Sequence, residues 1–155
     1  MSVYRGDWVL PRVPRIAVVV SQFNAAISEA LLEGALATLE RFGLGRDQVD
    51  VVWVPGAFEI PGVARKLQDR YDALITLGAV IRGETPHFDY VAGAVATGVA
   101  RLAQEGKIPV IFGVLTCNTV EEAEARAGGK QGNKGSEAAL AALEMISLYD
   151  KLSGA

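Results

Sequence analysis

Apolar residues occur along this chain in short continuous runs separated by longer stretches. The runs cover residues 15–21, 49–54, 73–80 and 109–115. A strand that is apolar throughout, without alternating polar positions, is typical of a sheet buried on both faces. The pattern therefore predicts four parallel strands.

The stretches between these runs predict helices. The first helix is expected over residues 27–42, and Gly43 fits its end because glycine favours the position after a helix. Asn118 and Glu121 have the spacing of a capping box ahead of a short helix that ends near residue 127. The other helices are predicted over residues 60–69, 88–104 and 136–152, the last one after a glycine-rich loop at 128–135.

Strands that alternate with helices predict an α/β fold, a three-layer sandwich around a four-stranded parallel sheet of flavodoxin-like type. At 155 residues, we expect a single domain over residues 1–155. Ligands of such sheets bind beyond the carboxyl ends of the strands. Function is therefore expected in four segments at that edge: 22–24, 56–59, 81–87 and 116–118.

Composition excludes several classes of protein. One cysteine and one histidine leave no disulfide framework, multi-cysteine zinc site or histidine cluster. A net charge of −3 argues against a nucleic-acid or polybasic membrane surface. No transmembrane run or signal peptide is recognised, so a cytoplasmic location is expected. The 50% share of hydrophobic residues is high for a small monomer, and indicates either a tight core or apolar subunit interfaces.

His87 is the first candidate for chemistry. It follows the third predicted strand, where an imidazole can move protons near neutral pH. Gly83, Glu84 and Thr85 precede it, and backbone N–H groups ahead of a helix attract anions. A structural histidine in an ordinary loop is the alternative.

Other side chains at the same edge suit a flat, phosphorylated ligand. Phe23 and Phe58 follow strand ends and could stack on a heterocycle, although core burial is the usual role of phenylalanine. Glu59 could accept hydrogen bonds from a ligand or cap a helix. Arg126 and Lys134 flank the glycine-rich loop, as phosphate ligands or as solvated surface charges.

Gly93 and Gly98 lie inside the helix predicted over residues 88–104. Each costs about 1 kcal/mol against alanine in a helix interior. Their presence indicates a small-residue face that packs closely, either on the sheet or against a copy of the same helix.

Five motifs, taken together and in this order, resemble the lumazine synthase (6,7-dimethyl-8-ribityllumazine synthase) family over nearly the whole chain. They are Phe23-Asn24, VPGAFEIP at 54–61, LGAVIRGETPHFDY at 77–90, PVIFG at 109–113 and AGGKQGNKG at 127–135.

The resemblance implies the penultimate step of riboflavin biosynthesis, in which 5-amino-6-(D-ribitylamino)uracil condenses with 3,4-dihydroxy-2-butanone 4-phosphate. It implies that His87 donates protons, that Phe23 stacks on the pyrimidine, and that Phe112 contacts it. Glu84, Thr85, Arg126 and, with a looser match, Lys134 would bind the phosphate. The remaining implied substrate contacts are Ala57, Phe58 and Glu59 at the ribityl chain, and Ala79, Val80 and Ile81 at the pyrimidine.

The resemblance also implies an assembly. The chemistry it brings uses neither metal nor redox cofactor. In the family the site lies between subunits, and the residues that match Phe112 and Arg126 come from the adjacent chain. We expect a pentamer, a 60-subunit shell built from pentamers, an N-terminal segment that adds to a neighbouring subunit's sheet, and an association with riboflavin synthase.

Two rival interpretations come from other classes of protein. A flavodoxin-like signalling or flavin-binding module is one, but residues 21–24 and 81–83 lack the acidic residues and the phosphorylatable aspartate of a receiver domain. A shell protein without catalytic activity is the other, and the presence of Phe23, His87 and Arg126 speaks against it.

Overall fold

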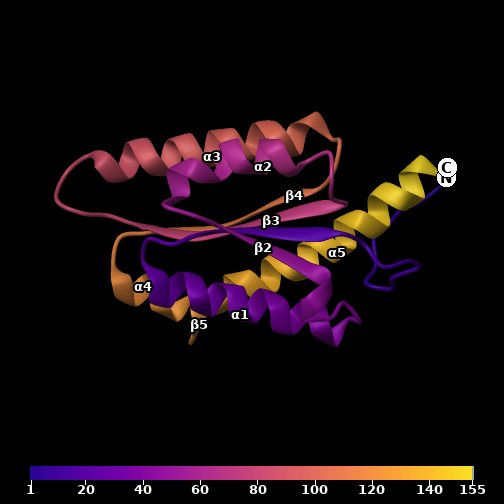
Figure 1. Cartoon of the computed structure of the whole chain (residues 1–155), viewed down its shortest axis with the longest axis horizontal. Coiled ribbons are helices and arrows are strands. Elements are labelled where there is room, and N and C mark those ends of the chain that lie inside the picture. The colour runs from indigo at the N-terminus through magenta and orange to yellow at the C-terminus, as the bar shows by residue number, and fades with distance from the viewer. Residues whose placement is uncertain (155) are drawn as a thin grey trace.

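A computed structural model describes residues 1–154, and its centre is a four-stranded parallel sheet in the order β2-β1-β3-β4. The strands pair in level register, with Ile16 opposite both Val49 and Ala73. All four carboxyl ends therefore point to one edge of the sheet (Figure 1). The strand bounds are β1 (Ile16–Ser21), β2 (Val49–Val54), β3 (Ala73–Ile81) and β4 (Val110–Cys117).

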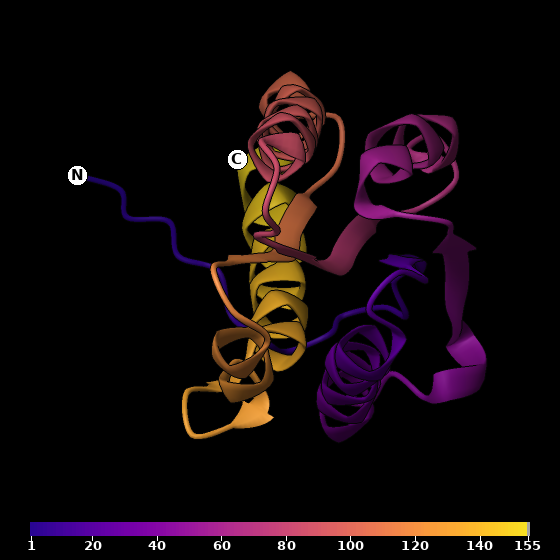
Figure 2. The ribbon, with the colours of Figure 1, turned by 90° about the vertical axis from the view of Figure 1, so that its left-hand side faces the viewer.

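Helices cover both faces of this sheet, so the predicted three-layer α/β sandwich is confirmed. Figure 2 views the sheet nearly end-on and shows helices on both sides of it. One layer holds α2 (Ile60–Leu67) and α3 (His87–Glu105); the other holds α1 (Ala25–Arg41), α4 (Val120–Ala125) and α5 (Lys134–Ser153). Two short 3-10 turns, η1 (Arg46–Gln48) and η2 (Ala57–Glu59), precede β2 and α2.

Each face of the sheet carries its own hydrophobic core. Leu31, Leu39 and Leu143 are fully buried between the sheet and the α1–α5 layer. Ile60 and Val95 are fully buried on the opposite face, under α2 and α3. Burial of one such side chain stabilises the fold by about 1.5–3 kcal/mol, which explains why the inner strands β1 and β3 are apolar at almost every position.

The prediction that every strand is buried on both faces is wrong for the outer strands. Asp50 and Trp53 of β2 and Phe112 of β4 are exposed. Both strands lie at an edge of the sheet, where the helical layers cover less of them.

The glycine-rich segment is a hairpin rather than an open loop. β5 (Ala127–Gly129) pairs antiparallel with β6 (Gly132–Asn133), and the positive φ angles of Gly128 and Gly132 make this tight return possible. Asn133 then caps α5, because its side chain accepts a hydrogen bond of 3.1 Å from the Ser136 N–H.

The cap of α4 lies one residue later than the sequence predicts. The Thr119 hydroxyl accepts a hydrogen bond of 3.1 Å from the N–H of Glu122, and the Glu122 carboxylate accepts one of 2.9 Å from the N–H of Asn118. Thr119 and Glu122 have the same spacing as Asn118 and Glu121, so spacing alone could not separate the two registers.

Gly98 explains the small-residue face of α3. A Cβ on Gly98 would lie 2.7 Å from the ring of Pro61, so α3 packs directly on α2 at this point. The partner of this glycine is therefore neither the sheet nor a copy of the helix. Gly93 faces open space.

The segment before β1 lies along α5 and forms no strand within residues 1–15. The Asp7 N–H donates a hydrogen bond of 3.1 Å to the Ser147 hydroxyl, and the Asp7 carboxylate pairs with Lys151 at 2.9 Å. The indole N–H of Trp8 donates one of 3.1 Å to the carbonyl of Leu140. These contacts hold the middle of the segment, at residues 7 and 8, against α5, while Val9 and Val13 remain exposed.

Candidate active site

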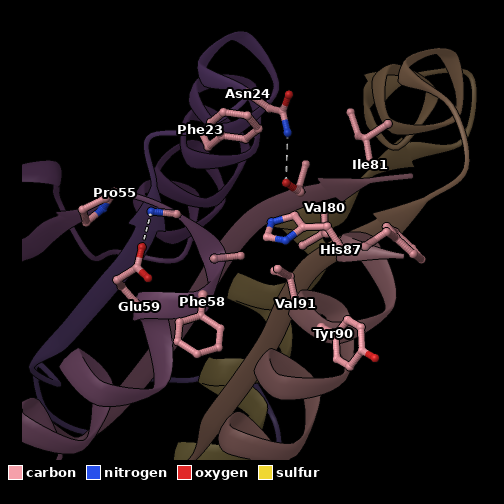
Figure 3. A pocket seen from close by; sticks show the side chains of 14 residues that line it. Phe23, Asn24, Pro55, Phe58, Glu59, Val80, Ile81, His87, Tyr90 and Val91 are labelled. Carbon is pink, nitrogen blue, oxygen red and sulfur yellow. Dashed lines mark hydrogen bonds between the residues drawn. The ribbon is translucent and has the colours of Figure 1, made fainter. Parts of the chain in front are cut away.

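A cavity of about 610 Å³ opens where β1, β2 and β3 end and α3 begins (Figure 3). The cavity lies beyond the carboxyl ends of the strands, where ligands of such sheets bind. Eight of the residues proposed from the sequence line it: Phe23, Ala57, Phe58, Glu59, Ala79, Val80, Ile81 and His87.

The turn after β1 presents Phe23 to this cavity. The following residue, Asn24, has a left-handed φ of 61°, which asparagine tolerates better than most residues. Its side-chain amide donates a hydrogen bond of 3.1 Å to the carbonyl of Ala79, and the N–H of Phe23 donates one of 3.2 Å to the carbonyl of Pro55. The ring of Phe23 is 71% exposed, so the core-burial alternative is wrong for this residue.

The turn after β2 presents a second aromatic ring. Glu59 accepts a hydrogen bond of 2.9 Å from the Gly56 N–H, which closes η2 like a helix cap. This turn buries Ala57 and leaves Phe58 61% exposed, so the alternative of core burial is wrong for Phe58 as well. Phe23 and Phe58 are therefore apolar rings held at the cavity with much of their surface free to contact a ligand.

His87 is the first residue of α3 rather than the end of the preceding loop. Its N–H contacts the Thr85 hydroxyl at 3.4 Å, and its exposed imidazole faces the cavity in Figure 3. Glu84 and Thr85 lie in the exposed loop between β3 and α3 and do not line the cavity.

The remaining predicted residues lie in a different place. Phe112, Arg126 and Lys134 line a second cavity of about 460 Å³ between the end of β4 and the α4–α5 region. Phe112 is 36% exposed, so its alternative role as a buried core residue is wrong too. One chain thus holds eleven of the predicted residues at two separate cavities, with His87 at the first and Arg126 at the second, while Glu84 and Thr85 line neither.

Both cavities contain residues that the sequence alone did not single out. Tyr90 and Val91 follow His87 by three and four positions, so the periodicity of a helix that starts at His87 places them on its side of α3. That spacing could have revealed them. Gln131 and Glu137 line the second cavity: Gln131 lies at the turn of the β5–β6 hairpin, and Glu137 follows Lys134 by three positions on α5.

Cys117 also lines the second cavity. Burial raises the pKa of its thiol, and the positive charge of Arg126 opposes that rise. Burial therefore favours the neutral thiol over the nucleophilic thiolate. The sequence indicates no role for Cys117, and a neutral thiol at this place does not suggest one.

Neither a metal-binding cluster nor a membrane-spanning helix is found among the described residues. Within residues 1–154, no group of three or more His, Cys, Asp or Glu side chains could hold a metal ion. Among the helices that the structure describes, none is both long and apolar enough to cross a membrane.

Comparison with known proteins gives two findings. A family model described as 6,7-dimethyl-8-ribityllumazine synthase matches residues 13–150. The 6,7-dimethyl-8-ribityllumazine synthase of Protochlamydia amoebophila (strain UWE25) is 50% identical over 155 residues, which cover 99% of this chain and 90% of that relative.

Proposed function

This chain belongs to the 6,7-dimethyl-8-ribityllumazine synthase family, and from that premise we propose how its two cavities serve the reaction. The enzyme condenses 5-amino-6-(D-ribitylamino)uracil with 3,4-dihydroxy-2-butanone 4-phosphate. The products are 6,7-dimethyl-8-ribityllumazine, phosphate and water. This is the penultimate step of riboflavin biosynthesis.

The first cavity is the proposed pyrimidine site. Phe23 stacks on the heterocycle, and Ala79, Val80 and Ile81 line the wall beside it. Ala57, Phe58 and Glu59 hold the ribityl chain. The exposed aromatic rings at this apolar pocket support the assignment, because a flat ligand that covers them removes their apolar surface from water.

The phosphate site is proposed to need two subunits. The loop with Glu84 and Thr85 contributes backbone N–H groups and a hydroxyl, and Arg126 and Lys134 contribute positive charge. Within one chain these two sets of residues lie apart. A neighbouring subunit that sets its second cavity against the first would add Phe112, Arg126 and Lys134 to the site.

His87 is the proposed proton donor. The amine of the pyrimidine attacks the ketone, and protonation of the departing hydroxyl yields an imine and water. Loss of the C3 proton together with the C4 phosphate then gives an enol. Its ketone form is attacked by the ribitylamino nitrogen, and a second water leaves as the ring closes. The proton transfers need a donor at the rim of the site, and the imidazole of His87 faces the cavity there.

The remaining proposals concern the whole protein. Residues 1–155 act as one domain, and the chain forms a pentamer that builds a 60-subunit shell, with riboflavin synthase as an associated partner. The N-terminal segment adds to the sheet of a neighbouring subunit. The location is the cytoplasm, where a single free thiol such as Cys117 stays reduced.

One assay tests the activity. The purified chain is mixed with both substrates, and lumazine absorbance and phosphate release are followed together. The expected result is equal amounts of both products, and none when either substrate is omitted. A folded, assembled protein that gives neither product would contradict the catalytic assignment and favour a shell protein without activity.

A further inference from the structure

The loop that joins β3 to α3 is exposed along its whole length, over residues 82–86. A Cβ on Gly83 would meet no atom within 4 Å. The second half of the loop has two local contacts: the N–H of His87 lies 3.4 Å from the Thr85 hydroxyl, and the N–H of Asp89 donates a 3.0 Å bond to the carbonyl of Pro86. A segment this open must be anchored if it is to hold a ligand in one geometry.

Arg82 supplies the anchor at the start of the loop. Its backbone N–H donates a hydrogen bond of 2.9 Å to the carbonyl of Cys117, and its side-chain Nε donates one of 2.9 Å to Oδ1 of Asn118. The guanidinium carbon lies 4.4 Å from the centre of the Phe88 ring, and Nη2 lies 3.4 Å from the Asp89 carboxylate. One side chain therefore joins the loop, the first turn of α3 and the corner after β4.

The corner that receives Arg82 is itself well held. The N–H of Asn118 donates a 2.9 Å hydrogen bond to the Glu122 carboxylate, and Thr119 caps α4. The carbonyl of Glu122 accepts a 3.1 Å hydrogen bond from Arg126. Arg82 thus fastens the loop of the first cavity to the same short helix that orients Arg126 in the second.

We propose that Arg82 is a positioning residue of the condensation, a clamp that holds the loop with Glu84 and Thr85, and the first turn of α3 with His87, in their working geometry. This inference rests on the proposed function of those residues. The Arg82 side chain is 46% exposed, so its ion pair with Asp89 is individually weak. What suits Arg82 to this role is the planar shape of its guanidinium, which can stack on Phe88 and at the same time donate a hydrogen bond from Nε to Asn118. A lysine side chain cannot make both contacts.

Steady-state kinetics on the full chain test the clamp, with Arg82→Ala, Arg82→Lys, Asn118→Ala and the double alanine variant. We expect Arg82→Ala to raise KM for the ketose phosphate about tenfold and to lower kcat severalfold, since small displacements of positioned groups are costly. The KM for the pyrimidine should change less than about twofold, because its proposed contacts lie on strand β3 and in the turns after β1 and β2, outside the loop that Arg82 holds. Arg82→Lys should rescue little.

Asn118→Ala is the decisive variant. It removes the acceptor but keeps the backbone bond to Glu122, so it should reproduce part of the Arg82→Ala pattern. The double variant should be no worse than Arg82→Ala alone, because the two residues act through one contact. Arg65→Ala removes an exposed arginine paired with Glu105 on the outside of α2 and α3, and as the matched control it should leave every constant unchanged.

The outcomes separate this inference from the proposed function. A wild-type chain without activity contradicts the function itself. An active wild type with both KM values and kcat unaltered in Arg82→Ala overturns the clamp. A raised KM in Arg82→Ala beside wild-type kinetics in Asn118→Ala also overturns it, because Arg82 would then bind the phosphate directly. If Arg82→Ala does not fold, Asn118→Ala with unaltered constants overturns the clamp by itself.

Discussion

At the scale of single residues, the site works through side chains that the fold leaves exposed. Phe23 and Phe58 are each more than half exposed although phenylalanine is normally buried, and the backbone bonds of their turns keep them so. A flat ligand that packs against both rings would explain this exposure. His87 is exposed beside them at the start of a helix.

Removal of the His87 imidazole tests its role as proton donor. We expect His87→Ala to fold and assemble normally, because the side chain is exposed, and to lower kcat about 10²-fold or less. Attack of an amine on a ketone proceeds without strong catalysis, which is why the loss should lie at the low end for a general acid. The steady-state rate of lumazine formation at saturating substrates measures it, and unchanged turnover would remove His87 from the mechanism.

Replacement of Arg126 and replacement of Phe23 should raise the KM of different substrates. We expect Arg126→Ala to raise KM for the ketose phosphate at least about tenfold with little change for the pyrimidine, because it removes the proposed charged ligand of the phosphate. Phe23→Ala should instead raise KM for the pyrimidine, because it removes a stacking partner. Arg46→Ala, at an exposed pair with Glu33, is the control. Equal effects of Arg126→Ala on both substrates would contradict the phosphate assignment.

At the scale of elements, hydrophobic patterning predicted every strand of the parallel sheet to within two residues, because buried parallel strands need continuous apolar runs. It missed the β5–β6 hairpin, whose five strand residues bury little apolar surface. The hairpin depends instead on the positive φ angles of Gly128 and Gly132. The same limit applies to the site. The positions of Phe23, Phe58 and His87 after predicted strands indicated that they lie at one edge of the sheet, and all three line one cavity. No local pattern in the sequence could show that Arg126 lines a different cavity of the same chain.

The anchor of the N-terminal segment on α5 is predicted to depend on pH. The hydrogen bond and charge of Lys151, with the Val9 N–H, lower the pKa of Asp7 below its ordinary value of 3.8. A carboxyl whose pKa is lowered by folding stabilises the contact above its ordinary pKa and loses this effect as the pH falls through the lowered value. The anchor should therefore be complete at neutral pH and weaken only below about pH 4.

Hydrogen exchange over residues 1–13 checks this dependence. Asp7→Asn should speed exchange of the segment at neutral pH, since it removes the charge that pairs with Lys151. The difference from the wild type should shrink as the pH falls well below 3.8. The same change at Asp47, which lies in η1 far from α5, is the control. Equal exchange of both variants and the wild type at pH 7 would show that Asp7 does not hold the segment.

At the scale of the whole molecule, a single chain is an incomplete enzyme under this proposal. Its two cavities lie in different regions of the chain and divide the predicted site between them. Exposed apolar side chains are also spread over both edges of the sheet and the N-terminal segment, with Trp53, Phe112 and Val13 as examples. An assembly that joins unlike cavities head to tail forms a ring when the rotation between neighbours closes, and each subunit then offers one half-site to each neighbour.

The last prediction is the size of that assembly. We expect a pentamer as the building block and a 60-subunit shell in phosphate buffer at neutral pH, so native mass measurement should give five or sixty times the 16.4 kDa of one chain. The turn between α4 and α5 is the proposed determinant, because the short hairpin at Gly128–Gly132 would let pentamers tilt together and a longer one would obstruct them.

An insertion of four residues between Gly129 and Lys130, at the exposed tip of the hairpin, should therefore give particles no larger than decamers. Lumazine formation should persist, because the shared site needs only the contact between neighbours within a ring. Insertion of the same four residues after Lys107, in the exposed turn between α3 and β4, serves as the control and should leave the shell intact. If the wild-type chain itself forms nothing larger than a decamer, the shell prediction is wrong, while the enzyme assignment stands on its own assay.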